Sequence, residues 1–203
     1  MTDAGGDGRW HRASRPAAPG AATHIRRADV GDADAVGRFQ VRAWEQTYRG
    51  IVPDAFLEAR SVRSGIDRWA ERIRSGVRRV LVAESSDGSL LGVASTTRAS
   101  SVQEDLPDLE LATLYVDPVA HGTGLASDLL EAATGGEDAH LLVFSVNLRA
   151  RRFYSRHGFV PVGEPVLDPG TGLDEERWVR RSPLALRAAR SDRGVPQGGS
   201  DEQ

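Results

Sequence analysis

The sequence of 203 residues contains no cysteine and no lysine, and it has a single methionine. The absence of cysteine excludes disulfide bonds, a thiolate metal site and a cysteine nucleophile. No apolar run approaches the roughly 20 residues that a membrane-spanning helix needs, and the N-terminus lacks the apolar segment of a signal peptide. We therefore expect a cytoplasmic protein that has no membrane partner.

The charge balance is close to neutral, with a formal net charge of −3 at pH 7. All 26 basic residues other than the histidines are arginines. Because there is no basic excess, nucleic acid is not an expected partner. With 39% hydrophobic residues, the chain is long enough to form one domain with its own core.

The two ends of the chain differ from its middle. Residues 1–22 are mostly Gly, Ala, Pro and Arg, and residues 183–203 have no hydrophobic periodicity. Such segments bury too little apolar surface to offset the entropy lost on ordering. We expect a disordered arm at 1–22, a folded domain at 23–182 and a disordered tail at 183–203. A monomer and a homodimer are both compatible with this organisation.

Between these ends, hydrophobic periodicity predicts a mixed α/β domain. Strands are expected at 24–26, 79–84, 90–98, 109–116, 140–146, 159–162 and 176–180, with a loop rich in Pro, Asp and Gly before the last one. Helices are expected after a capping signal at Asp29 and Asp32, over 62–73, from Leu125 to the glycines at 135 and 136, and over 148–157. The apolar run 140–146 follows a strand-helix unit, which favours a central strand parallel to 109–116.

The most informative stretch runs from Glu110 to Leu130. Strict alternation along its strand would place Glu110, Ala112, Leu114 and Val116 on one face of the sheet. Two glycines, Gly122 and Gly124, then precede a helix. The first turn of a helix has unpaired N–H groups, so a glycine loop that opens a helix is typical of an anion site. Taken alone, however, the loop is more typical of an ordinary strand-to-helix connection.

A second block of sequence changes this interpretation. The segment from Val146 to Val160 is similar to the pattern Asn-x-x-Ala-x-x-Phe-Tyr-x-x-x-Gly-Phe of the GNAT acetyltransferase superfamily. The loop at 121–126 resembles the same family's Gln/Arg-x-x-Gly-x-Gly/Ala, with His121, Gly124 and Ala126 at the matching positions. The resemblance covers 25 to about 181. His121 stands where the family usually has Arg or Gln, which is expected to bear on coenzyme affinity more than on activity.

This resemblance implies a fold and a co-substrate. The fold would be a mixed, largely antiparallel sheet of six to seven strands, with helices on both faces and a parallel, splayed pair of central strands. Acetyl-CoA would lie in the opening of the splay. The residues that the resemblance places along the coenzyme are Leu114, Tyr115 and Val116 on the strand, His121, Gly122, Thr123, Gly124, Leu125 and Ala126 in the loop, and Asn147.

Two residues are candidates for acid-base chemistry. Glu110 matches the family's glutamate on the fourth strand and could accept a proton from an amine, directly or through water. The alternative is a solvent-facing strand residue. Tyr154 could donate a proton to the departing thiolate of the coenzyme, because a phenol is neutral at pH 7. The alternative is a core tyrosine bonded to the backbone. Asn147 could also be a plain helix N-cap, and the two roles are compatible.

The resemblance implies transfer of acetyl to a primary amine of a small molecule or a protein N-terminus, by direct attack in a ternary complex. Trp44 and Tyr48 lie near a Gly and Pro bend and could form a wall of the acceptor pocket or pack in the core. Neither His121 nor His157 has a partner at metal-ligand spacing, so no metal is expected. Ser145 lacks the partners of a serine hydrolase. A rival hypothesis is an inactive acyl-CoA sensor or scaffold module.

Overall fold

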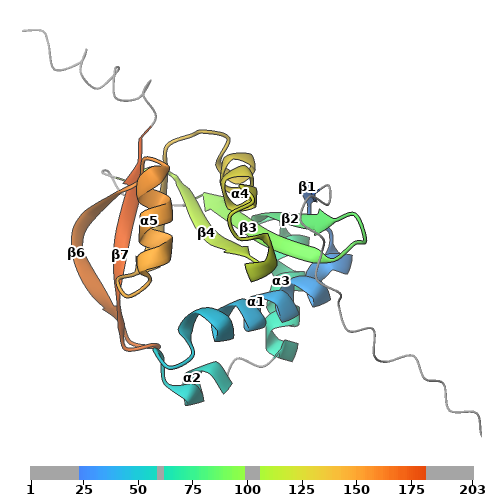
Figure 1. The fold of residues 1–203 in the computed structure, drawn as a ribbon, viewed down its shortest axis with the longest axis horizontal. Helices are drawn as coiled ribbons and strands as arrows, with labels where there is room; N and C mark the ends of the chain where they lie inside the picture. Colours follow the sequence, from blue (N-terminus) through green and yellow to red (C-terminus); the bar gives the residue numbers. More distant parts are fainter. Residues whose placement is uncertain (1–22, 59–61, 99–105, 182–203) are drawn as a thin grey trace, which may run out of the picture.

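The computed structural model describes residues 23–58, 62–98 and 106–181 (Figure 1). The arm expected at 1–22 and the tail expected at 183–203 lie outside these residues.

The described residues form a seven-stranded sheet in the order β1-β2-β3-β4-β5-β7-β6. Neighbouring strands are antiparallel throughout, apart from the parallel pair β4 and β5. This confirms the predicted mixed, largely antiparallel fold. The strands are β1 (Thr23–Arg27), β2 (Arg79–Ser85), β3 (Leu90–Arg98), β4 (Leu109–Val116), β5 (Ala139–Phe144), β6 (Val160–Asp168) and β7 (Leu173–Arg180).

The parallel pair is held together at one end only. Its register contains two pairs of residues, Leu109 with Ala139 and Glu110 with His140. Because β4 continues to Val116 and β5 to Phe144, the rest of the two strands runs without mutual pairing. The sheet therefore opens at its centre into the splay that was predicted.

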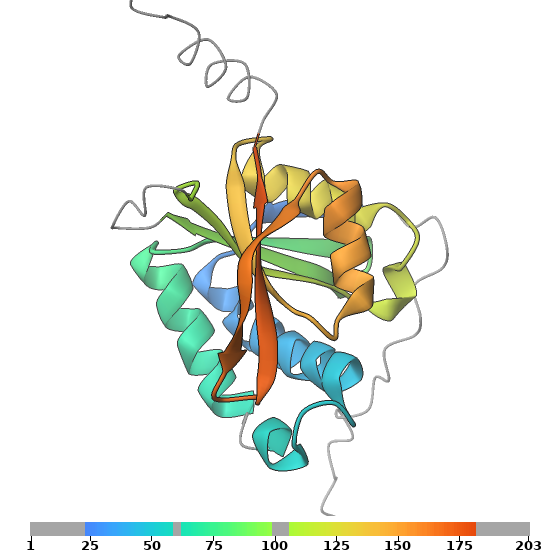
Figure 2. The ribbon, with the colours of Figure 1, turned by 90° about the vertical axis from the view of Figure 1, so that its left-hand side faces the viewer.

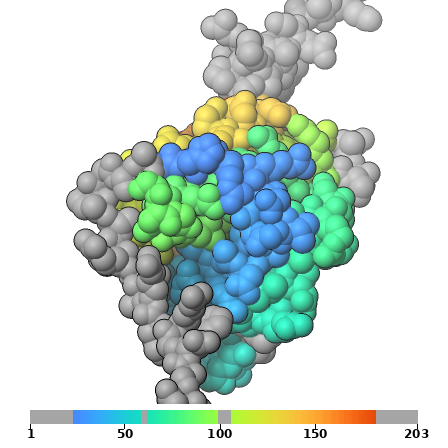
Figure 3. Space-filling model, turned by 90° about the vertical axis from the view of Figure 1, so that its right-hand side faces the viewer, coloured from blue at the N-terminus to red at the C-terminus, as the bar shows by residue number. Residues whose placement is uncertain are grey.

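Helices cover both faces of the sheet (Figure 2). One face carries α1 (Ala33–Tyr48) and α3 (Val62–Ser75), whose Phe39 and Trp69 are buried against Val82 and Val93. The other carries α4 (Leu125–Thr134) and α5 (Leu148–Arg156). The other helical segments are short: the 3-10 helices η1 (Val30–Asp32) and η2 (Pro118–Ala120) and the α-helix α2 (Asp54–Glu58). Figure 3 shows β1, α1 and α3 side by side at one surface of the molecule.

The last two strands are longer than the sequence predicts. Strand β6 reaches Asp168 and β7 begins at Leu173, so a tight turn replaces the expected loop. The turn is closed by the Gly172 N–H, which donates to the Asp168 carbonyl at 2.8 Å. Prolines at 161 and 165 are tolerated because β6 is an edge strand, and its register shifts between Val162 and Val166. The central strand β5 ends at Phe144, two residues before the predicted end at 146.

A bulge in β4 reverses the expected alternation of its side chains. Ser95 of β3 pairs with Thr113, but the next residue pairs with Leu111, which leaves Ala112 as the extra residue. Leu111 and Leu114 consequently pack in the same cluster as α4, although strict alternation would separate them. The prediction that Glu110 shares a face with Leu114 and Val116 is therefore wrong, since an extra residue inverts the period of two.

The packing of α1 on α3 depends on one glycine. A Cβ built on Gly37 would lie 2.9 Å from the backbone nitrogen of Ile66, whereas one on Gly65 would be 3.7 Å from the nearest atom, the Gly37 carbonyl oxygen. We predict that Gly37→Ala destabilises the fold by about 1–2 kcal/mol, because the helices must separate.

Gly65→Ala is the matched control and should be neutral or stabilising, by up to about 1 kcal/mol, since alanine favours the helix. Thermal and urea unfolding of both variants would test this. Equal loss of stability in the two variants would show that helix contact is not the cause.

Candidate active site

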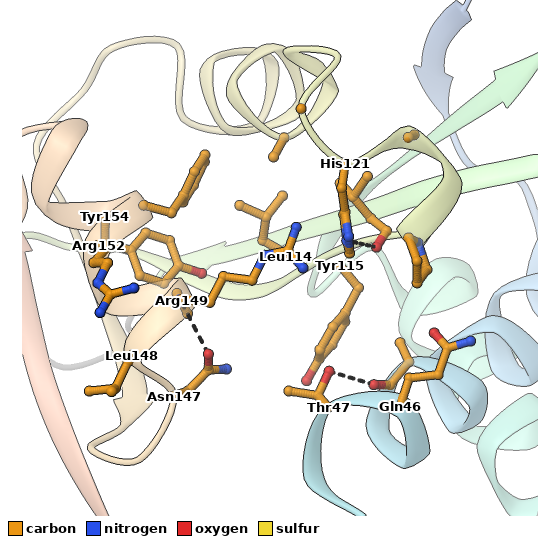
Figure 4. Close-up of a pocket in the computed structure, with 18 of the residues that line it drawn as sticks. Gln46, Thr47, Leu114, Tyr115, His121, Asn147, Leu148, Arg149, Arg152 and Tyr154 are labelled. Atoms are coloured by element: carbon orange, nitrogen blue, oxygen red, sulfur yellow. Dashed lines mark hydrogen bonds between the residues drawn. The ribbon is translucent and has the colours of Figure 1, made fainter. Parts of the chain in front are cut away.

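An open cleft of about 820 Å³ lies in the splay of the sheet (Figure 4). Four parts of the chain form its walls: the C-terminal turns of α1, the end of β4, the segment 118–127, and the helix α5 with the residues before it. Of the predicted coenzyme-binding residues, those that line the cleft are Leu114, Tyr115, Val116, His121, Gly122, Gly124, Ala126 and Asn147. Thr123 and Leu125 belong to the same loop but are not among the lining residues.

The glycine loop leaves several main-chain donors available. Gly122 and Gly124 have φ values of 80° and 94°, which only glycine adopts readily. Gly124 is the N-cap of α4 and has no capping side chain, while its carbonyl accepts from the N–H groups of Ser127 and Asp128. Among the described residues, no backbone partner is found for the Gly122 and Gly124 N–H groups. The loop therefore presents N–H groups and the positive end of a helix to the cleft.

Side chains of the loop have local partners. The Thr123 hydroxyl donates to the Ala120 carbonyl at 2.7 Å. Buried Leu125 packs into the core below. The His121 Nε2 atom lies 3.1 Å from the Val116 carbonyl oxygen, across the turn that follows β4. Burial, and secondarily the nearby Arg149 guanidinium, lower the pKa of His121. His121 therefore fixes the turn rather than adding a positive charge at neutral pH.

The exposed backbone of β4 faces the splay. The Asp117 N–H donates to the Leu91 carbonyl at 2.8 Å, so this pair is a hydrogen-bonded position of the antiparallel ladder. Hydrogen-bonded and non-bonded positions alternate, which turns the main-chain groups of Val116 and Leu114 away from β3. They point towards β5, which has already diverged. An extended ligand could pair with them as an additional strand would.

Tyr154 lies where the cleft narrows. Its side chain is only 8% exposed, and Figure 4 shows the phenol reaching from α5 towards Leu114. No hydrogen-bond partner for the hydroxyl occurs among the described residues, unlike a core tyrosine bonded to the backbone. Burial, and secondarily the nearby Tyr48, raise the pKa of the Tyr154 phenol far above its ordinary value, so it stays neutral.

Asn147 connects α5 with α1. Its Oδ1 atom accepts from the Ala150 N–H at 3.0 Å, which makes Asn147 the N-cap of α5, and its Nδ2 atom donates to the Tyr48 hydroxyl at 3.1 Å. The N-cap alternative for Asn147 is thus present, and the residue also lines the cleft. At the C-terminal end of the helix, the Nε2 atom of His157 lies 2.9 Å from the Ser127 hydroxyl of α4. These two contacts fix the position of α5 across the opening.

A second pocket, of about 300 Å³, adjoins the cleft. Trp44 and Tyr48 both line it and are both buried, so packing in the core does not prevent them from forming a pocket wall. The aromatic rings of Phe56 and Phe144 also line this pocket, and Trp44 packs against both rings. The pocket and the cleft share the lining residues Tyr48, Leu114, Tyr115, Asn147, Ala150 and Tyr154.

Charged residues divide between the two spaces. Among the described residues, the cleft is lined by Arg149, Arg152 and Arg156 and by no carboxylate. Within the same ranges, the pocket is lined by Glu110 and two further carboxylates, Asp168 and Glu175, and by no basic residue. The sequence analysis singled out Glu110 alone. The arginines recur at intervals of three and four residues, a helical spacing that could have identified them as one face of α5.

The described residues contain no group of three or more His, Cys, Asp or Glu side chains arranged to hold a metal ion. Within the same ranges, no helix has the length and apolarity required to cross a bilayer.

Comparison with known proteins identifies the family. The model of the acetyltransferase (GNAT) domain matches residues 45–172, more than half of the chain. An uncharacterised N-acetyltransferase of Archaeoglobus fulgidus is 35% identical over 138 residues, which are 64% of this chain and 88% of the relative.

Solved structures show the same fold. The PaiA N-acetyltransferase of Thermoplasma acidophilum, in complex with coenzyme A, gives a TM-score of 0.58 at 20% identity, over 79% of this chain and 99% of that chain. A spermidine N-acetyltransferase of Vibrio cholerae, in complex with CoA and spermine, gives 0.58 at 18% identity, over 81% and 98%. The protein belongs to the GNAT acetyltransferase family and is an acetyl-CoA-dependent acyltransferase.

Proposed function

We propose that the protein transfers the acetyl group of acetyl-CoA to a primary amine, by direct attack within a ternary complex. The observation that carries this proposal is the division of charge between two connected spaces. One space offers arginines and bare N–H groups, which suit a polyanion. The other offers carboxylates and aromatic rings, which suit a cationic amine. Tyr154 lines both spaces at their junction.

In this proposal the coenzyme spans the cleft. The N–H groups of the loop at 122–126 bind the pyrophosphate, and the arginines of α5 add positive charge along the same wall. The main-chain groups of Leu114 and Val116 pair with pantetheine. The Val116 N–H lies on the side of β4 that faces the splay and would polarise the thioester carbonyl.

The acceptor must lose a proton before it attacks. An alkylamine has a pKa of about 10.4 and is therefore an ammonium ion at neutral pH. Glu110 supplies a carboxylate in the second pocket, and we assign it the role of proton acceptor, directly or through water. The free amine then forms the new C–N bond to the carbonyl carbon, and the C–S bond breaks as the tetrahedral intermediate collapses.

Tyr154 assists the leaving group. Its neutral phenol, which has no hydrogen-bond partner among the described residues, can donate a hydrogen bond to the departing sulfur. Because its pKa is raised, stabilisation of the developing thiolate is its main contribution. The nitrogen of the ammonium ion loses two protons in all, one to Glu110 before the attack and one after the C–N bond has formed. One of these protons ends on the thiol and the other passes to solvent.

The size of the acceptor pocket favours a small molecule over a protein N-terminus. The pocket encloses about 300 Å³ between α1, α2 and the turn from β6 to β7. The Vibrio cholerae structure with the same fold was solved with CoA and spermine, a small amine. This supports a small amine as acceptor here.

The loop can be tested with paired glycine variants. We predict that Gly124→Ala raises the Kd of acetyl-CoA at least about tenfold, because a methyl group at φ 94° strains the loop and projects into the phosphate site. Gly163→Ala in β6 shares the positive φ and the open surroundings, but lies outside the cleft.

Both variants should lose about 1–2 kcal/mol of stability, and only the first should lose affinity. Isothermal titration calorimetry and thermal unfolding measure the two quantities. An unaltered Kd for Gly124→Ala would remove the loop from the coenzyme site.

Substitution of the tyrosine separates binding from turnover. We predict that Tyr154→Phe lowers kcat about a hundredfold, because the thiolate loses its hydrogen-bond donor. The fold should lose little stability, since the hydroxyl has no hydrogen-bond partner in the part of the chain that the structure describes. Thiol release with a panel of amines checks the first point and thermal unfolding checks the second, while acetyl-CoA titration shows whether binding is kept.

The same experiment addresses the rival hypothesis of an acyl-CoA sensor. The observation that favours a sensor is His121, a neutral residue at a position where the family usually carries Arg or Gln. Tight acetyl-CoA binding by the wild-type protein without thiol release for any amine class would favour the sensor.

A further inference from the structure

The acceptor pocket contains more negative charge than one amine needs. Its three carboxylates come from three strands, Glu110 from β4, Asp168 from β6 and Glu175 from β7. No arginine or histidine is among the residues that line it. Burying like charges together is unfavourable without compensation, so this arrangement calls for positive charge from a ligand.

One of the three carboxylates already has a structural task. Asp168 accepts hydrogen bonds from the Thr171 N–H at 3.0 Å and from the Thr171 hydroxyl at 2.7 Å, and it holds the turn between β6 and β7. The Asp168 carboxylate still raises the pKa of Glu175, but its Oδ2 atom is engaged in the hydrogen bonds of the turn. Glu110 and Glu175 are left to meet a ligand.

Glu175 shows the effect of this environment. It pairs across the ladder with Phe144, so the two side chains lie on the same face of the sheet, towards Tyr48. No hydrogen bond to its carboxylate is found among the described residues. Burial raises the pKa of Glu175, and the Asp168 carboxylate raises it further, while Arg177 opposes the shift. An ammonium ion bound beside Glu175 would reverse this unfavourable state.

Glu110 and Glu175 lie well apart along the same face. Glu110 pairs with His140 and Glu175 with Phe144, four residues further along β5. At a rise of about 3.3 Å per residue, these positions are separated by about 13 Å along the strand direction, and the two carboxylates also lie on opposite sides of β5. Aromatic rings of Trp44 and Phe56 line the same pocket. A single ammonium group cannot compensate both carboxylates, whereas a short chain with a charge at each end can.

The two carboxylates lie in an aromatic-walled pocket whose described lining residues include no basic side chain. From this placement we infer that the acceptor is a small diamine, and that Glu175 determines this specificity by holding the ammonium group that does not react. The other amine loses its proton to Glu110 and attacks the thioester, with the same balance of bonds and protons as above. This inference rests on the proposed function.

Matched substrates test it. Thiol release is measured with n-butylamine and with the diamine of the same carbon chain, each over a range of concentrations. The wild-type protein should prefer the diamine by about tenfold in kcat/KM, mainly through KM, because a charge-assisted hydrogen bond is added. Glu175→Gln should reduce that preference about tenfold. Glu164→Gln, on the exposed strand β6 and outside both lining sets, is the control and should keep the preference.

Each outcome decides a specific point. Equal kcat/KM for the two amines in the wild-type protein would overturn the diamine inference and leave the acetyltransferase proposal standing. A fall in kcat for both amines in Glu175→Gln would identify Glu175 as a proton acceptor and overturn its role in specificity. Absence of acetyl-CoA binding, or of thiol release with any amine, would instead overturn the proposed function itself.

Discussion

The short contact between β4 and β5 is the constraint on which the rest of the molecule depends. Two residue pairs join the strands at one end, and beyond them the two strands do not pair with each other. Helix α5 lines the opening, where Asn147 holds it to Tyr48 of α1 and His157 holds it to Ser127 of α4. The cleft and the second pocket adjoin at this gap in the sheet, where they share lining residues.

The sequence predicted the features that have a local chemical signature. Glycines at 122 and 124, the N-cap at Asn147 and the seven strands were all recognisable, because each reflects backbone conformation or periodicity within a few residues. The bulge at Ala112 had no such signature, since alanine is an ordinary strand residue and the extra residue is defined only by the pairing with β3. That one residue decides which face Glu110 occupies.

Other parts of the site could not be read from the sequence because they are assembled across it. Asp168 and Glu175 come from a hairpin that was expected to be a loop. They line the same pocket as Glu110 only because β7 lies beside β5. The arginines of α5 had a visible helical spacing, yet their relation to the glycine loop appears only when α4 and α5 share a face of the sheet. Division of charge between two neighbouring spaces is a property of the fold.

The use of arginine along the cleft has a chemical consequence for a protein that handles an activated acyl group. In the proposed binding mode, a lysine at position 149, 152 or 156 would place a nucleophilic amine in the same cleft as the thioester, where its neutral form could take the acetyl group. Guanidinium groups keep their proton at all physiological pH values and are poor nucleophiles. Since the chain has no lysine at all, no side chain of the protein can compete with the acceptor or be modified by its own reagent through an ε-amine.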